Sequence, residues 1–242
     1  KGQGFCWGKN EQGQLGYGLP ANFVDYPAPV AGYLTGASIQ AGNQHTCARQ
    51  ESGEVYCWGR HEIAPLGNGT SAGIVASRSI PQRVAGNVVF RQLETGWNYA
   101  CGVGNDETIY CWGDNRHGQA GQHGSRGAVV EPTPLAEDPG LTRVWAGQGH
   151  ACGRTETGEA YCWGQNTSGE IGVKGAPEQI NPMLSSGRQE GVGATHVPQL
   201  VSKDIAFVEL APGGWHTCGL DEQGQAYCWG SHHNGQLGLG EK

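Results

Sequence analysis

The stretch "HTCARQESGEVYCWG", residues 45–59, carries two cysteines ten positions apart on either side of a short polar segment. The same spacing recurs further along the chain, at residues 101 and 111, 152 and 162, and 218 and 228. A unit that recurs at intervals of about 50 residues or more indicates a repeat protein. Four cysteine-bearing hairpins are therefore predicted, at residues 45–59, 99–113, 150–164 and 216–230.

The register of each hairpin follows from its loop. In the first unit, a three-residue loop at residues 51–53 pairs Gln50 with Glu54 and, counting outward, Cys47 with Cys57. Directly opposed residues of an antiparallel pair have Cα atoms about 4.5 to 5.5 Å apart, which a disulfide tolerates. Glycine holds the third loop position in three units, as Gly53, Gly158 and Gly224, where a left-handed residue is favoured, and Glu107 replaces it in the second unit. The pattern predicts four disulfides, which join Cys47 to Cys57, Cys101 to Cys111, Cys152 to Cys162 and Cys218 to Cys228.

Alternation along a strand gives each hairpin two different faces. Tyr56 lies opposite Ala48 and Trp58 lies opposite Thr46, so aromatic side chains cover small residues on one face while the cysteines occupy the other. A single hairpin cannot bury such a face in water, but stacked repeats can. Packing against a neighbouring sheet is therefore predicted for the tryptophan of every "CWG" motif, namely Trp7, Trp58, Trp112, Trp163 and Trp229.

Cysteine usage favours an oxidising compartment, because cytosolic thiols are kept reduced. The alternatives to disulfides are a zinc site and free buried thiols. Structural zinc sites use ligand pairs two to four residues apart, and no two cysteines have that spacing. The expected location is extracytoplasmic, meaning periplasmic, on the cell surface or secreted.

Composition indicates an all-β chain and excludes several partners. The sequence has 43 Gly and 12 Pro, only 15% charged residues, and a formal net charge of −7 without a basic cluster. Nucleic acid and anionic membrane surfaces are therefore not expected as partners. No apolar run approaches the roughly 18 to 20 residues that span a bilayer, so no transmembrane segment is expected. No phosphate-binding or calcium-binding loop pattern occurs, and no cofactor or metal is expected.

A longer consensus surrounds each hairpin. A Pro-x-x-Val or Pro-x-x-Leu segment precedes a short apolar strand, which is followed by Gly-x-x-His, the cystine hairpin and a segment of the form "WGxNxxGQLGxG". This consensus resembles the repeat of the regulator of chromosome condensation family, and the cystines resemble those of its exported and extracellular members. The resemblance implies a β-propeller of four-stranded antiparallel blades. It further implies that residues 1–242 form a single domain, or a fragment, of a ring that usually has seven blades.

The spacing of the repeats sets the expected limits of the ring. The "CWG" tryptophans are 51, 54, 51 and 66 residues apart, each close to one blade. The partner expected for Cys6 would fall before Lys1, so we expect a half blade at residues 1–16, an unpaired Cys6, and a native protein that extends beyond both ends of this chain. A five-bladed ring is possible only if another segment supplies the missing strand.

Three groups of residues are candidates for function. The longest interval contains an inserted loop at about residues 175–196, within which a partner is expected to meet Gln179, Asn181, Met183, Arg188 and Glu190. His45, His150 and His216 occupy one position in different repeats, which favours a repeated structural hydrogen bond over a metal site. Three tryptophans outside the "CWG" motif are candidates for sugar binding, namely Trp97, Trp145 and Trp215.

The function expected from these features is non-enzymatic. We expect an extracytoplasmic scaffold whose rim loops bind a protein partner, in the manner of a subunit of a surface or membrane-associated assembly. The alternatives are a carbohydrate-binding propeller, a secreted enzyme inhibitor and, least favoured, a guanine-nucleotide exchange factor. The last is suggested only by analogy with the family's nuclear member, and fold alone does not transfer function.

Overall fold

The computed structural model describes residues 2–19, 21–32, 34–70, 77–124, 127–173 and 193–239. Every regular element in these ranges is a β-strand. Two strands form the N-terminal sheet, β1 (Phe5–Lys9) and β2 (Phe23–Pro29). Sheet 1 contains β3 (Gly36–Ala41), β4 (His45–Gln50), β5 (Val55–Arg60) and β6 (Ser77–Arg83). Sheet 2 contains β7 (Phe90–Thr95), β8 (Tyr99–Gly104), β9 (Ile109–Asp114) and β10 (Ala128–Pro134).

The remaining strands form two further sheets. Sheet 3 contains β11 (Leu141–Ala146), β12 (His150–Thr155), β13 (Ala160–Gln165) and β14 (Ala194–Leu200). Sheet 4 contains β15 (Phe207–Pro212), β16 (His216–Asp221) and β17 (Ala226–Gly230). Neighbouring strands pair antiparallel in sequence order. No helix long and apolar enough to cross a membrane occurs within the described ranges.

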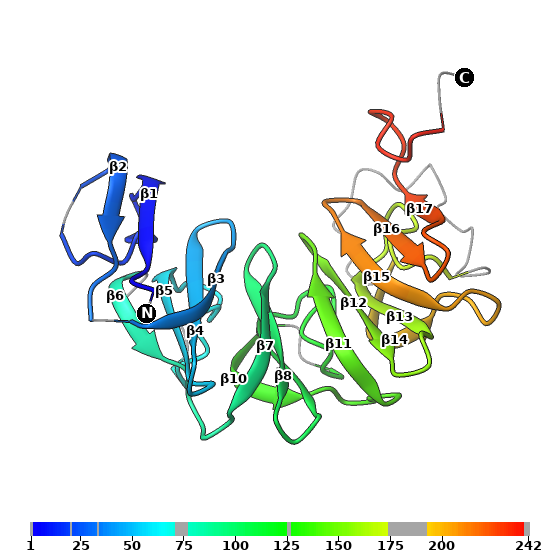
Figure 1. Ribbon diagram of the computed structural model, residues 1–242, viewed down its shortest axis with the longest axis horizontal. Coiled ribbons are helices and arrows are strands. Elements are labelled where there is room, and N and C mark those ends of the chain that lie inside the picture. The colour runs from blue at the N-terminus through cyan, green and yellow to red at the C-terminus, as the bar shows by residue number, and fades with distance from the viewer. Residues whose placement is uncertain are drawn as a thin grey trace.

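The sheets follow one another as blades along an open arc, with the N-terminal sheet at one tip and sheet 4 at the other (Figure 1). The first strands of sheets 1 to 4, β3, β7, β11 and β15, line the concave side and contact one another in series. The prediction of an all-β fold with four-stranded antiparallel blades is thus confirmed. The number of blades in a closed ring stays a prediction.

The predicted hairpin register is confirmed residue by residue. Cys47 pairs with Cys57 across β4 and β5, and the Gln50 N–H donates to the Glu54 carbonyl at 2.8 Å. Counting away from the turn from that hydrogen-bonded pair places the cysteines in a non-hydrogen-bonded pair, in which the two Cα atoms lie closer together. Their Cα atoms accordingly lie 4.1 Å apart, slightly less than expected. All four predicted disulfides are present, joining Cys47 to Cys57, Cys101 to Cys111, Cys152 to Cys162 and Cys218 to Cys228.

The core lies between the sheets. The disulfide of sheet 1 packs against Phe90, Leu93 and Trp112 of sheet 2, so a cystine face meets a tryptophan face. The same contact is repeated between sheets 2 and 3 and between sheets 3 and 4. Because each sheet buries one face on each neighbour, no sheet needs a core of its own.

The indoles of Trp58, Trp112, Trp163 and Trp229 also donate hydrogen bonds to loop carbonyls of the preceding sheet. The Nε1 atom of Trp58 donates to the Gln14 carbonyl at 2.8 Å, which lies in the loop after β1. The equivalent bonds run from Trp112 to Pro65 (3.0 Å), from Trp163 to Gln119 (3.1 Å) and from Trp229 to Glu170 (2.8 Å). A Cβ on Gly16 would lie 2.5 Å from the Trp58 Nε1 atom, which explains the glycine that ends the "GQLG" motif.

The prediction that Trp7 packs against a neighbouring sheet is wrong for this structure. Its side chain is 61% exposed, whereas Trp58, Trp112 and Trp163 are fully buried and Trp229 is half-buried. The buried indoles contact the loop of the preceding sheet, and the described residues contain no sheet before β1. Cys6 is the free cysteine, and partial burial raises its pKa.

The predicted insertion falls almost wholly outside the described residues, and so do Gln179, Asn181, Met183, Arg188 and Glu190. Strand β14 begins at Ala194, so the last part of the segment expected to be a loop pairs with β13 instead. The N-terminal sheet likewise reaches beyond residue 16, since β2 ends at Pro29.

Candidate functional site

The turn rim is the surface formed by the four turns that join the first and second strands of sheets 1 to 4. These turns comprise residues 42–45, 96–99, 147–150 and 213–216. In each turn the N–H of the glycine donates to the carbonyl of the fourth residue, at 2.8 or 2.9 Å. The recurring Gly-x-x-His motif, which is Gly-x-x-Tyr in sheet 2, is therefore a closed turn, and the motif alone does not predict the surface that the four turns form.

Backbone hydrogen bonds join successive turns into one ladder. The Asn43 N–H donates to the Trp97 carbonyl (3.2 Å), the Trp97 N–H to Gln148 (3.3 Å), and the Gln148 N–H to Gly213 (3.0 Å). Because these bonds involve only the backbone, they do not restrict which side chains stand at positions 43, 97 and 148. The rim is thus a fixed frame that can carry variable side chains.

Glycine is required at the first turn position because consecutive turns approach each other closely. A Cβ on Gly96 would lie 2.6 Å from the Gly147 carbonyl oxygen, and one on Gly147 would lie 2.6 Å from that of Gly213. Separations under 3.0 Å demand a shift of the backbone. Substitution of these glycines would therefore separate the turns and break the ladder.

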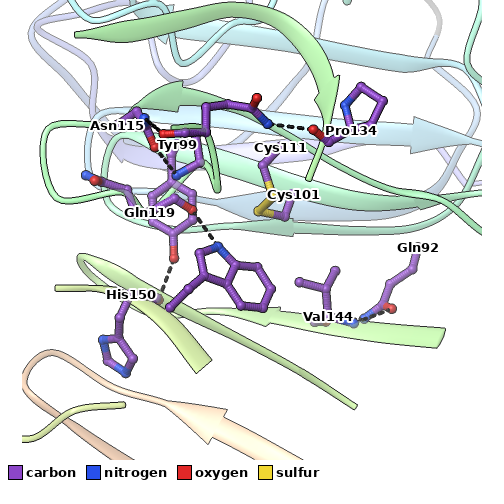
Figure 2. Close-up of a disulfide and its surroundings, with 12 residues drawn as sticks. Gln92, Tyr99, Cys101, Cys111, Asn115, Gln119, Pro134, Val144 and His150 are labelled. Carbon is purple, nitrogen blue, oxygen red and sulfur yellow. Dashed lines mark hydrogen bonds between the residues drawn. A yellow bond between two sulfur atoms is a disulfide. The ribbon is translucent and has the colours of Figure 1, made fainter. Parts of the chain in front are cut away.

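A layer of buried rings supports the rim from below. The Tyr99 hydroxyl donates to the His150 carbonyl at 2.5 Å, as Figure 2 shows beside the disulfide of Cys101 and Cys111. The same view shows Gln92, whose amide binds both the carbonyl (2.6 Å) and the N–H (3.2 Å) of Val144 in the next sheet. Adjacent sheets are therefore joined by polar contacts as well as by the core.

The expected histidine hydrogen bond is present at His150 and absent at His45. The His150 Nε2 atom lies 2.8 Å from Thr217 Oγ1 in the next sheet, but neither ring nitrogen of the buried His45 has a partner. Ala100 holds the position equivalent to Thr217 and offers no hydroxyl. Burial lowers the pKa of both His45 and His150 to about 4. Among the described residues, no three His, Cys, Asp or Glu side chains are grouped as metal ligands.

Two exposed tryptophans stand on the turn rim. Trp97 is 41% exposed and lines a shallow depression of about 370 Å³ between the turns, and Trp215 is 49% exposed beside Gly214, another lining residue. Trp145 differs from both, since it is half-buried against the core between sheets 3 and 4. The Arg143 guanidinium lies over its ring, 5.5 Å from the ring centre. Of the three candidate aromatic residues, two are thus available to a ligand.

The opposite ends of the strands carry a different surface, the hairpin-tip rim. It consists of the turns between the second and third strands of sheets 1 to 4. The rim is strongly acidic and includes Glu51, Glu54, Asp106, Glu107, Glu156, Glu159 and Glu222. Some of these carboxylates are already engaged, since Glu54 pairs with Arg83 at 3.0 Å and Asp106 accepts the Tyr110 hydroxyl at 2.7 Å.

The blades, the interlocked turns and the indole bonds define a repeat protein of the β-propeller class. The chain belongs to the regulator of chromosome condensation (RCC1) repeat family, whose models match residues 1–49, 37–62, 90–119, 143–170 and 207–236. It is similar to the ultraviolet-B receptor UVR8 of Arabidopsis thaliana, with 28% identity over all of this chain and 52% of the receptor. It is also similar to the human E3 ubiquitin-protein ligase HERC2, with 26% identity over 99% of this chain and 5% of the ligase.

Among solved structures, yeast RCC1 (Prp20) bound to Kap60 has the same fold. The TM-score is 0.76 and the identity 21%, over 91% of this chain and 50% of the yeast chain. This chain therefore spans about half the length of the plant receptor and of the yeast protein.

Proposed function

We propose that this chain is a non-enzymatic extracytoplasmic module that binds a protein partner on the turn rim. The observation that carries the proposal is the exposure of Trp97 and Trp215 on the frame of interlocked turns. Tryptophan is enriched at the centres of protein interfaces because it buries a large area with little loss of side-chain entropy. A backbone already held in place loses less freedom on binding.

The family supports an interaction role in general terms. Yeast RCC1, which has this fold, is described in complex with Kap60. We carry over the use of the fold as a binding surface and not the identity of the partner, because function depends on the site. The ligase HERC2 contains a similar segment in only 5% of its length, which fits a non-catalytic role for such a segment.

The disulfides support the proposed location. Disulfides form and persist mainly in oxidising compartments and are rare in the cytosol, and this chain has four of them in successive sheets. We include in the proposal a role as a subunit of a surface or membrane-associated assembly, because a rigid extracytoplasmic frame meets protein partners there.

Affinity purification of the native partner tests this function. The bait is compared with its Trp97→Ala/Trp215→Ala variant and with a control variant on the hairpin-tip rim, Glu51→Gln/Glu222→Gln. We expect one protein to be retained by the wild type and the control at equal levels and to be lost at least about tenfold from the tryptophan variant. Retention by all three baits would contradict docking on the turn rim. Alkylation of protein taken directly from cells tests the location, since eight free thiols at the disulfide positions would exclude an oxidising compartment.

Carbohydrate binding is the second candidate, because the same two exposed indoles could stack on sugar rings. The residues with polar side chains that line the depression are Asn43, Thr95 and Gln148. Titration of soluble glycans while tryptophan fluorescence is followed distinguishes the candidates. A glycan that quenches the wild type and not the tryptophan variant would favour sugar over protein.

A further inference from the structure

One position differs between sheet 1 and the other sheets in a way that leaves space in the core. The first residue of the first strand is Phe90 in β7, Leu141 in β11 and Phe207 in β15, and each is buried. In β3 it is Gly36. The registers are equivalent, because Gly36 pairs with Gln50 and Phe90 with Gly104, and both strands shift register immediately afterwards.

The large side chain has a defined place in the other sheets. The ring of Phe90 lies 5.9 Å from that of Tyr110 in an edge-to-face arrangement and 5.7 Å from that of Trp112. Phe207 repeats both contacts with Tyr227 and Trp229, each at 5.9 Å. Sheets 2 to 4 thus each hold one apolar side chain against their own tyrosine and tryptophan. Sheet 1 has the tyrosine and the tryptophan but lacks that side chain.

A second substitution accompanies the first. The residue beneath the ring is glycine in sheets 2 to 4, where a Cβ would lie 2.7 Å from Phe90 at Gly102, from Leu141 at Gly153 and from Phe207 at Gly219. Sheet 1 has Ala48 there. One methyl group replaces only a small part of a phenyl group, so the exchange leaves a cavity.

The cavity of about 190 Å³ lies between sheet 1 and the N-terminal sheet. Its walls are mainly apolar and include the buried Val30, Leu34, Ala48 and Trp58, with Gln3 and Ser38 as polar lining residues. Ile39, also in the lining, is 43% exposed, so the pocket is partly open to solvent. An apolar cavity of about 150 Å³ is large enough to bind benzene. The space therefore suits one aromatic ring.

We propose that this cavity binds a single aromatic ring of a small molecule. The ring takes the position that Phe90 and Phe207 hold in their own sheets, against Trp58 and close to Tyr56. Phenyl rings fill the equivalent space in two of the three other sheets, which is the reason to expect an aromatic ligand. This site is separate from the turn rim, so the proposed partner docking does not depend on it.

Benzene is the probe, and the Nε1–H resonance of Trp58 in a nitrogen-15 spectrum is the readout, with that of Trp163 as the internal reference. We expect benzene to shift the Trp58 resonance saturably and to leave Trp163 unchanged. The filled variant Gly36→Phe/Ala48→Gly copies the arrangement of sheet 2, and its affinity should fall at least about tenfold because the space is occupied. The control Ala48→Gly keeps the cavity and should still bind.

Two results would overturn the proposal. One is the absence of saturable binding to the wild type, and the other is unchanged binding by the filled variant. If the phenylalanine variant fails to fold, Gly36→Leu/Ala48→Gly copies sheet 3 and gives the same decision.

Discussion

His150 and Thr217 form a hydrogen bond between neighbouring blades, with 2.8 Å between Nε2 and Oγ1. Thr217 also donates to the Glu170 carbonyl at 2.9 Å, so one hydroxyl joins three parts of the molecule. His45 holds the equivalent position in sheet 1. Ala100 of sheet 2 takes the place of the threonine, and neither ring nitrogen of His45 has a hydrogen-bond partner.

Substitution Ala100→Thr should therefore stabilise the protein. The new hydroxyl can accept from His45 and donate to the Pro65 carbonyl, as Thr217 does with its neighbours. A buried donor without a partner costs about 1–3 kcal/mol, and we expect a gain within that range in the free energy of unfolding, measured with urea. Ala100→Val has the same shape without the hydroxyl and should show no such gain. If the two variants raised the free energy of unfolding equally, the gain would come from packing and not from the hydrogen bond.

Stability should fall as the solution is acidified from pH 6.5 to pH 4. Burial lowers the pKa of His45 and His150 to about 4, so in this window the unfolded chain binds protons that the folded protein does not. The stability is complete above pH 6.5 and is lost progressively toward pH 4, by at most about 1.4 kcal/mol per pH unit for each histidine. Urea unfolding at several pH values measures the slope. His45→Gln should reduce it, and an unchanged slope would show that His45 is not the group responsible.

The local parts of this fold could be predicted from the sequence, whereas contacts between sheets could not. The pairing of Cys47 with Cys57 depends on a loop of three residues, so counting was sufficient. The bond from Trp112 to Pro65 joins residues 47 positions apart and depends on how whole sheets stack. The exposure of Trp7 could not be predicted for the same reason, because the residues that bury a "CWG" indole belong to another sheet. The Gly36 cavity did leave a signal, since aligning the repeats on their Pro-x-x-Val segments places glycine beside Phe90, Leu141 and Phe207.

The indole hydrogen bond should matter more in sheet 3 than in sheet 1. Trp163 donates to the Gln119 carbonyl, and Ala151 opposite it offers no second donor. The Gln14 carbonyl instead receives both Trp58 and the Thr46 hydroxyl, each at 2.8 Å. Trp163→Phe leaves a buried carbonyl unsatisfied and should cost about 1–3 kcal/mol more than Trp58→Phe. Both indoles are fully buried, so the two variants are matched in burial. Equal costs in urea unfolding would assign the effect to lost packing alone.

The second hairpin tip is strained by a side chain. Glu107 has φ 67°, in the left-handed region that Gly53, Gly158 and Gly224 occupy at the same position. A left-handed conformation costs a residue with a Cβ about 1–2 kcal/mol. Glu107→Gly should raise the free energy of unfolding by about that amount. Glu107→Ala removes the charge and keeps the Cβ, so it should gain little. A matching gain from alanine would indicate relief of acidic repulsion on the hairpin-tip rim instead.

The four disulfides should differ in their resistance to reduction. Three of them are fully buried between sheets, whereas Cys218 and Cys228 are only half-buried, because the described chain has no further sheet against this face of sheet 4. A reductant must reach a sulfur atom to attack it, so access controls the rate. We expect graded dithiothreitol under native conditions, followed by alkylation and mass spectrometry, to label Cys218 and Cys228 before the other pairs. The singly reduced protein should remain folded, since closing so small a ring contributes at most about 3 kcal/mol. Simultaneous labelling of all four pairs would show instead that reduction follows global unfolding, which would make the buried cystine faces parts of one cooperative unit.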